Sequence, residues 1–342
     1  MTILRWKHCK SSIIILVVCT ALLLSACTIV YKSAGDIMLG FAEDEGMPYL
    51  LTTEDVFMGC AMTEAFTPFL LSFSKVTTPP GQLAIMFYLL AGNCAEFKAW
   101  EEELRYLRSI HAKNALEAED ARIAQQRWLY LAARRQLKAY QYLLSIGLEP
   151  GGQCPEFKTD NEEFFWMMGL VSGLQAIIND MASQGSAEVP LDIAAKVGRS
   201  AACLDNNKWW GLPAAMQAAI WITIPGQKPV DRRPVEVMDQ AITTGLQQGM
   251  RIAQVLAAQV ALGQGEITRV KEIIRKHAAE KNHTPGNPAY KFLDEAATRQ
   301  IQAISDRLWT QATGKRTPIG GLGTFWDDSG KAVETIDIDD ML

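Results

Sequence analysis

The sequence predicts an all-α protein, built as an antiparallel helical array of the TPR-like or α-solenoid kind. Apolar residues recur at helical spacing through most of the chain, and the alternation typical of β-strands is nearly absent. Short breaks containing glycine or proline separate about ten such segments, which favours antiparallel packing of consecutive helices. The TPR pattern of about 34 residues is not met, so repeats would be degenerate.

The first 26 residues have the parts of a lipoprotein signal peptide: a basic region, an apolar run over residues 13–24 and small residues before Cys27. The run of about 12 residues is too short to cross a bilayer core that needs roughly 20. The ending resembles the lipobox of bacterial lipoproteins, which implies that Cys27 is acylated and becomes the first mature residue. Acyl chains would hold the protein on the periplasmic face of a membrane. Thr28 rather than Asp favours the outer membrane. The alternatives are an uncleaved anchor and an ordinary signal with a chance cysteine.

Four regions follow from this interpretation. Residues 1–26 are the lipoprotein signal peptide and residues 27–50 a lipidated tether that ends in a turn at Gly46-Met47-Pro48. Residues 51–312 form the helical TPR-like domain. Residues 313–342 are a Gly-rich and acidic C-terminal arm, which contacts around Phe325-Trp326 are expected to order before a loose tail.

The first helices of the domain are expected on either side of a tight break at residues 77–81. One helix is capped by Thr52 or Thr53 and runs to about Ser74, with a bend at Pro68. Another runs over residues 82–94. After a weak point at Gly92-Asn93, the apolar spacing of residues 97–107 continues one helical face.

The helix expected over residues 114–146 is the most regular, because an apolar residue recurs at every seventh position: Leu116, Ile123, Tyr130, Leu137 and Leu144. We expect this stripe to pack on neighbouring helices. A coiled coil is the alternative, but polar residues four positions after each stripe residue disfavour it.

Residues 164–178 are apolar on all sides, which is typical of a helix at the buried centre of a fold. Gly169 and Gly173, four positions apart, predict close contact with another helix. The remaining helices are expected over residues 190–204, 214–222, 234–262, 266–281 and 289–312.

Four cysteines follow Cys27: Cys60, Cys94, Cys154 and Cys203. An oxidising periplasm permits disulfides. Cys60 and Cys94 lie at nearly equal distances from the turn near Thr78, so an antiparallel hairpin would bring them to the same height. They are therefore a candidate disulfide, with two buried free thiols as the alternative.

Composition and motifs disfavour several functions. The whole chain has a formal net charge of −5 and no concentrated basic patch, so nucleic acid is not expected as a partner. The chain has no phosphate loop, nucleophile elbow or zinc signature, so we predict no catalytic residue, metal or cofactor. Glu64 or the Glu101-Glu102-Glu103 run could serve a glycosidase, but solvated helix faces explain these acids better.

Aromatic residues concentrate near the middle of the chain, together with Met167, Met168 and Met216. Core packing is the default interpretation. The alternative is a groove or pore for an apolar ligand or a partner. We predict a groove because two adjacent tryptophans at a helix start rarely both point into one core. Its candidate binding residues are Trp166, Trp209, Trp210 and Trp221.

The chain resembles the T-component (TatT-like) lipoproteins of TRAP transport systems. The resemblance rests on the lipobox, on the helical pattern over residues 50–312 and on three segments. They are residues 122–127 (RIAQQR), 163–169 (EFFWMMG) and 204–211 (LDNNKWWG). The resemblance implies a TPR-like lipoprotein with a pore through each protomer, assembly as a homotrimer and docking to the periplasmic solute-binding protein.

The function expected from the sequence is that of a non-enzymatic, membrane-anchored periplasmic lipoprotein. It would bind a solute-receptor partner and an apolar small molecule in TRAP-type transport. One alternative is a helical lipoprotein scaffold for cell-envelope assembly. Another, from a different class, is a cell-wall glycosidase of all-α superhelical form.

Overall fold

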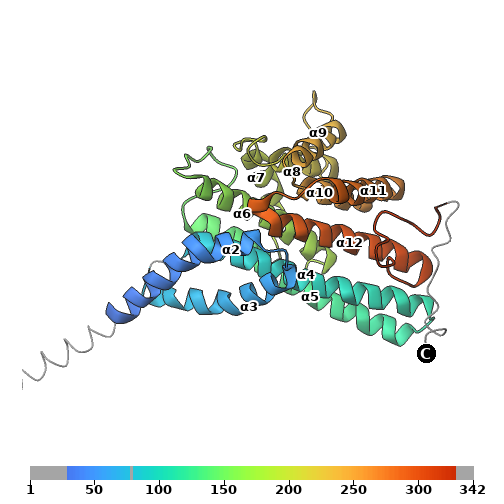
Figure 1. Ribbon diagram of the computed structural model, residues 1–342, viewed down its shortest axis with the longest axis horizontal. Helices are drawn as coiled ribbons and strands as arrows, with labels where there is room; N and C mark the ends of the chain where they lie inside the picture. The colour runs from blue at the N-terminus through green and yellow to red at the C-terminus, as the bar shows by residue number, and fades with distance from the viewer. Residues whose placement is uncertain (1–28, 78–79, 329–342) are drawn as a thin grey trace, which may run out of the picture.

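The computed structural model describes residues 29–77 and 80–328, and these residues form helices and no β-strand. The all-α fold class is therefore confirmed. In Figure 1 the two longest helices, α4 (Gly81–His111) and α5 (Ala115–Ser145), lie side by side as a hairpin. The last helix, α12 (Lys291–Thr313), lies between this hairpin and a second group of helices. The predicted signal peptide, Cys27 and the acidic tail after residue 328 lie outside the described residues.

The region expected to be a tether is helical from residue 29 onward. Residues 29–41 form a helix, and a π-helical turn, η1 (Ala42–Gly46), connects it to α2 (Met47–Thr52). Met47 and Leu50 are buried in the core. The predicted turn at Gly46-Met47-Pro48 was wrong, because proline is tolerated in the first turn of a helix, where its missing N–H needs no partner. The helical domain thus begins before residue 51.

The hairpin of α3 (Val56–Ser72) and α4 follows, with the short 3₁₀ turn η2 (Phe73–Lys75) after α3. Asp55, rather than Thr52 or Thr53, caps α3, since its carboxylate accepts a hydrogen bond from the Met58 N–H at 2.9 Å. The expected weak point at Gly92 does not interrupt α4. Gly92 instead permits close approach of α5, because a Cβ there would lie 2.6 Å from the side chain of Gln136.

Helix α5 begins and ends close to the predicted positions, and Asn114 caps it by accepting a hydrogen bond from the Glu117 N–H. The prediction that its seven-residue stripe packs on neighbours was wrong for four of the five stripe residues. Leu137 packs against the core, and Ala133 and Tyr140 beside the stripe are buried. Leu116 is 82% exposed, and Ile123, Tyr130 and Leu144 are also exposed. The buried face is a different one, rich in alanine, because small side chains let the long hairpin helices approach closely: Ala118, Ala121, Ala132, Ala133 and Ala139.

Helix α6 (Asp160–Ala182) is the buried centre that its apolar sequence predicted. Its two glycines face α5. A Cβ at Gly169 would lie 2.5 Å from the Leu143 side chain, and one at Gly173 would lie 2.7 Å from the ring of Tyr140. The predicted close helix contact is therefore present, and it is made with α5.

The second group contains five helices: α7 (Asp192–Ala201), α8 (Leu212–Thr223), α9 (Pro234–Gln247), α10 (Ile252–Gly263) and α11 (Ile267–His283). The single helix expected over residues 234–262 is in fact two. Gly249, with φ of +70°, turns the chain between them. The turn directs Arg251 inward, where its guanidinium pairs with Asp294 at the start of α12.

Helix α12 closes the array, which distinguishes the fold from an open solenoid. In a solenoid each repeat contacts only its neighbours in sequence. Here α12 contacts α2, α3 and α4 from the N-terminal region as well as α10 and α11. A TPR-like or solenoid arrangement is not confirmed.

The C-terminal arm is ordered by contact through residue 328, as expected. Phe325 is buried beside α11 and α12. The Trp309 indole N–H donates to the Thr324 carbonyl at 3.0 Å, and Lys271 pairs with Asp327 at 2.6 Å. The arm also reaches α4, because Arg316 pairs with Glu101.

Substitution of Gly211 by alanine is expected to destabilise the second group of helices. Gly211 has φ of +77°, which costs a residue with a Cβ about 1–2 kcal/mol. A Cβ there would also lie 2.2 Å from the Ala241 carbonyl oxygen, and backbone cannot easily move. Gly226→Ala is the control, since Gly226 has φ of +79° and open space around it. Thermal unfolding should show a larger decrease in stability for Gly211→Ala than for Gly226→Ala. Equal decreases would contradict the close approach to α9.

Candidate functional site

Three of the four tryptophans predicted to line a groove lie in the core instead. Trp166, Trp209 and Trp210 are buried at 1%, 2% and 4% exposure, so the groove prediction was wrong for all three. Trp221, on α8, is only half-buried. The rings of Phe164, Trp209, Trp210 and Tyr290 instead contact one another, with Trp210 and Tyr290 centroids 4.5 Å apart. This aromatic cluster is part of the core.

Both Trp209 and Trp210 are buried because of the backbone conformation before α8. The groove prediction assumed that Trp209 and Trp210 open a helix, where neighbouring side chains diverge by about 100°. They lie in a turn instead, and α8 begins only at Leu212. Trp210 adopts a left-handed conformation with φ of +53°, which lets both rings enter the same core.

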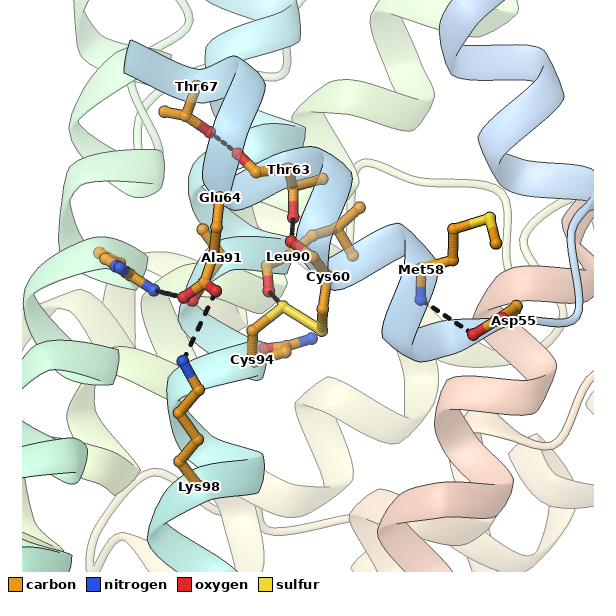
Figure 2. Close-up of a disulfide and its surroundings, with 12 residues drawn as sticks. Asp55, Met58, Cys60, Thr63, Glu64, Thr67, Leu90, Ala91, Cys94 and Lys98 are labelled. Atoms are coloured by element: carbon orange, nitrogen blue, oxygen red, sulfur yellow. Dashed lines mark hydrogen bonds and ion pairs between the residues drawn. A yellow bond between two sulfur atoms is a disulfide. The ribbon is translucent and has the colours of Figure 1, made fainter.

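Two disulfides tie the chain together. Cys60 on α3 is bonded to Cys94 on α4, with Cα atoms 5.5 Å apart, so the candidate pairing from the hairpin geometry is present. Figure 2 shows this bond crossing between the two helices, with Glu64 and Lys98 beside it. A second bond, Cys154–Cys203, joins the loop before α6 to the turn after α7. The spacing of Cys154 and Cys203 along the chain supported no separate prediction for that pair.

A candidate site lies in the partly open hollow where α3, α4 and α12 meet, and we call it the α3–α12 cavity. Its volume is about 360 Å³, in the size range of small-molecule sites. The Cys60–Cys94 bond lines one side. The other lining residues are Phe57, Ala61, Glu64, Phe97, Lys98, Trp100, Glu101, Leu104, Arg299, Gln302, Ala303, Asp306 and Arg316.

Aromatic rings form much of the apolar wall. The ring centroids of Phe57 and Phe97 are 6.1 Å apart, and those of Phe97 and Trp100 are 5.1 Å apart. Arg299 places its guanidinium 4.8 Å from the centroid of Phe57. A cation over an aromatic face is held by the ring quadrupole. The cavity thus combines flat apolar surfaces with a positioned positive charge.

The other charges of the cavity are mostly paired with one another. Glu64 pairs with Arg135 at 2.6 Å and with Lys98 at 3.6 Å, while Glu101 pairs with Arg316. Arg299 differs, since no carboxylate lies within ion-pair distance of it within residues 29–77 and 80–328. Arg299 is therefore the cation most available to a ligand.

The glycosidase alternative required a buried glutamate of raised pKa in a cleft. Glu64 and Glu101 do line the cavity, but each is engaged by a basic side chain. Burial raises the pKa of Glu96 to about 7, but Glu96 is not among the cavity-lining residues. No group of three metal-ligating side chains occurs in the described part of the chain.

Glu96 belongs to a buried polar cluster between α4, α5 and α6. Gln136 donates to Asn93 at 3.1 Å, and Asn179 donates to Gln136 at 2.8 Å and contacts Glu96. This cluster adjoins a small cleft of about 70 Å³, which we call the amide-lined cleft after Asn93, Gln175, Gln259 and Gln300 in its lining. Met168 and Met216 line that cleft, so two of the methionines singled out in the sequence do border a cavity, without the tryptophans.

Glu96 is expected to make stability depend on pH. Its pKa of about 7 in the folded protein exceeds the ordinary 4.5, so its stabilising contribution is complete below pH 4.5 and is lost as the pH rises through 7. At 1.36 kcal/mol per pKa unit, the loss between pH 5 and pH 8 is about 2–3 kcal/mol. Urea unfolding of Glu96→Gln at both pH values should lack this loss. An equal pH dependence in the two proteins would contradict it.

No protein-family model, curated protein or solved structure matches the chain. The resemblance to T-component lipoproteins therefore stays a prediction from the sequence.

The cavity was missed because its walls come from distant parts of the chain. Phe97, Trp100 and Leu104 were recognised as one helical face, but nothing in their spacing shows that α3 and α12 leave a gap beside them. Arg299 is one of several arginines on polar helix faces. Only the return of α12 to the N-terminal helices brings it to Phe57.

Proposed function

We propose that the protein is a membrane-anchored helical binding protein of the cell envelope, whose α3–α12 cavity binds a small anion with an aromatic or aliphatic body. The observation that carries the proposal is the position of Arg299, a guanidinium without a carboxylate partner in the described part of the chain, beside an aromatic wall.

The chemistry of the cavity favours a ligand of mixed character. A guanidinium binds a carboxylate through two parallel hydrogen bonds, and such charge-assisted bonds are stronger than neutral ones. The rings of Phe57, Phe97 and Trp100 suit an apolar body, since aromatic rings pair favourably when offset or edge-on. A neutral apolar ligand would leave Arg299 unpaired, and a small polar ion would leave the rings unused.

The location and the partners in this proposal come from the sequence. The lipobox predicts attachment to a membrane through acyl chains on Cys27 and a periplasmic position. The family resemblance predicts transfer of the ligand to a periplasmic solute-binding protein in TRAP-type transport. Two disulfides support the oxidising compartment, because such bonds persist in the periplasm and are rare in the cytosol. A homotrimer stays a prediction.

Calorimetry with a matched pair of probes tests the cavity. Indole-3-acetate should bind at least about tenfold more tightly than the neutral indole-3-acetamide, since a hydrogen bond to a charged group contributes about 1.5–3 kcal/mol. Arg299→Gln should remove the difference, and Ala61→Trp should block both probes by filling the cavity. Arg233→Gln, at an exposed ion pair at the start of α9 that does not line the cavity, should bind like the unaltered protein. Equal binding of both probes, or a preference that survives Arg299→Gln, would refute the proposal.

The exposed α5 stripe favours the second function, a scaffold for cell-envelope assembly. Leu116, Ile123 and Tyr130 repeat on one face, as in helices that bind a partner helix. Leu116→Ser with Ile123→Ser should then impair the tolerance of cells to detergent while leaving binding in the cavity unchanged. Normal tolerance in that double variant would count against the scaffold.

A further inference from the structure

Exposed apolar side chains concentrate near the N-terminal end of the described chain. They lie on the helix of residues 29–41, on α2 and on α3, and they are Ile29, Val30, Tyr31, Ile37, Phe41, Tyr49, Phe57, Met58, Phe66 and Phe69. Single exposed apolar residues need no explanation, but a large contiguous set marks an interaction surface.

Helix α3 presents the longest part of this surface. With η2 it forms the segment Val56–Lys75, which is long and apolar enough to cross a membrane, but only a third of it is buried in the protein. One side of α3 packs on the protein through Thr63, Thr67 and Leu70. The helix is therefore only partly inside the fold, and its apolar outer side is exposed.

The outer side of α3 carries no charge. Glu64 is the one ionisable residue of α3, and it is directed to Arg135 and Lys98, as Figure 2 shows for Lys98. The Cys60–Cys94 bond holds the same side of the helix to α4. What remains outward, away from the α3–α12 cavity, is apolar: Met58, Ala65, Phe66 and Phe69.

This outer side is continuous with the helix of residues 29–41. The Phe66 and Phe69 centroids are 6.1 Å apart, and those of Phe69 and Phe73 are 5.4 Å apart. Phe73 in turn packs against Gly35, where a Cβ would lie 2.9 Å from its ring. We call the outer side of α3 together with residues 29–41 the N-terminal apolar surface.

We propose that the N-terminal apolar surface lies in the interface of a lipid bilayer, with α3 parallel to the membrane plane. The apolar run of residues 13–24 and Cys27 directly precede residue 29 in the sequence, so the part of the fold nearest the membrane-directed segment is also its most apolar part. A helix with one apolar face and one buried face enters the headgroup boundary without crossing the core. Because α3 has no basic residue and residues 29–41 carry one basic and one acidic residue, Lys32 and Asp36, zwitterionic lipid suffices.

This inference relies on the proposed anchoring only to bring the chain to a bilayer, and it is independent of ligand binding in the cavity. The test supplies the bilayer directly. The full chain is reconstituted in phosphatidylcholine vesicles that carry a photoactivatable group on one acyl chain, and the labelled peptides are identified by mass spectrometry. Label is expected in α3 and in residues 29–41. Helix α5, whose Leu116 and Ile123 are equally apolar and exposed, should stay unlabelled.

A pair of double variants completes the test. Phe66→Ser with Phe69→Ser should lower the labelling of α3 severalfold, and because both side chains are exposed the fold should be retained. Leu116→Ser with Ile123→Ser is the matched control and should leave the labelling unchanged. Absence of label from α3, or equal label on α5, would overturn the proposal.

Discussion

Replacement of Trp210 by alanine is expected to lower the free energy of unfolding by about 3–5 kcal/mol, the usual cost of deleting a buried tryptophan. Trp210 is 4% exposed, and its ring packs against Trp209 and Tyr290. Urea unfolding followed by circular dichroism measures the loss, since the free energy falls linearly with denaturant.

Trp221→Ala is the matched control for Trp210→Ala, because Trp221 belongs to the same predicted set but is only half-buried. Trp221→Ala should lower the free energy of unfolding clearly less than Trp210→Ala. Binding of indole-3-acetate to folded Trp210→Ala, measured at low denaturant, should be unchanged, since Trp210 does not line the α3–α12 cavity. A stable Trp210→Ala protein that no longer binds the probe would restore the groove interpretation.

Arg251→Met is expected to cost about 3–5 kcal/mol, as for removal of one partner of a buried ion pair. Arg251 is 1% exposed. Its guanidinium pairs with Asp294 and donates to the carbonyls of Glu280 and Thr284, near the end of α11. The methionine would leave a buried carboxylate and two carbonyls without these donors. Calorimetric unfolding at pH 7 measures the loss.

A second substitution separates the charge from the packing. Asp294 also accepts from the backbone N–H of residue 251, and asparagine retains that acceptor without the charge. Asp294→Asn should therefore destabilise the unaltered protein but stabilise Arg251→Met. Arg233→Met, at the exposed pair with Glu236, should cost under about 1 kcal/mol. If Asp294→Asn has the same effect in both backgrounds, Arg251 and Asp294 are not coupled and the account of this junction is wrong.

The sequence predicted what depends on local pattern. The buried α6 followed from its uniform apolarity, and its contact with α5 followed from Gly169 and Gly173, because two small residues four apart lie on one helical face. Cys60 and Cys94 could be paired because a short turn between two antiparallel helices fixes which of their residues lie at the same level along the helix axes.

What could not be predicted depends on tertiary contacts. On α5 an alanine-rich face was buried in preference to the leucine stripe, because close approach of two long helices favours small side chains. The left-handed Trp210 has no signal in its own identity, since φ above zero is uncommon for any residue except glycine. Arg251 could not be distinguished from a surface charge until the break between α9 and α10 was known.

Binding of an anion with an apolar body at Arg299 of the α3–α12 cavity can be observed directly. The most direct test is anomalous diffraction from crystals of the protein soaked with 5-bromoindole-3-acetate. The account predicts a bromine peak among Phe57, Phe97 and Trp100, with the carboxylate of the probe on the guanidinium of Arg299. A bromine peak in the amide-lined cleft alone, or no peak in a cavity that calorimetry shows to be accessible, would contradict it.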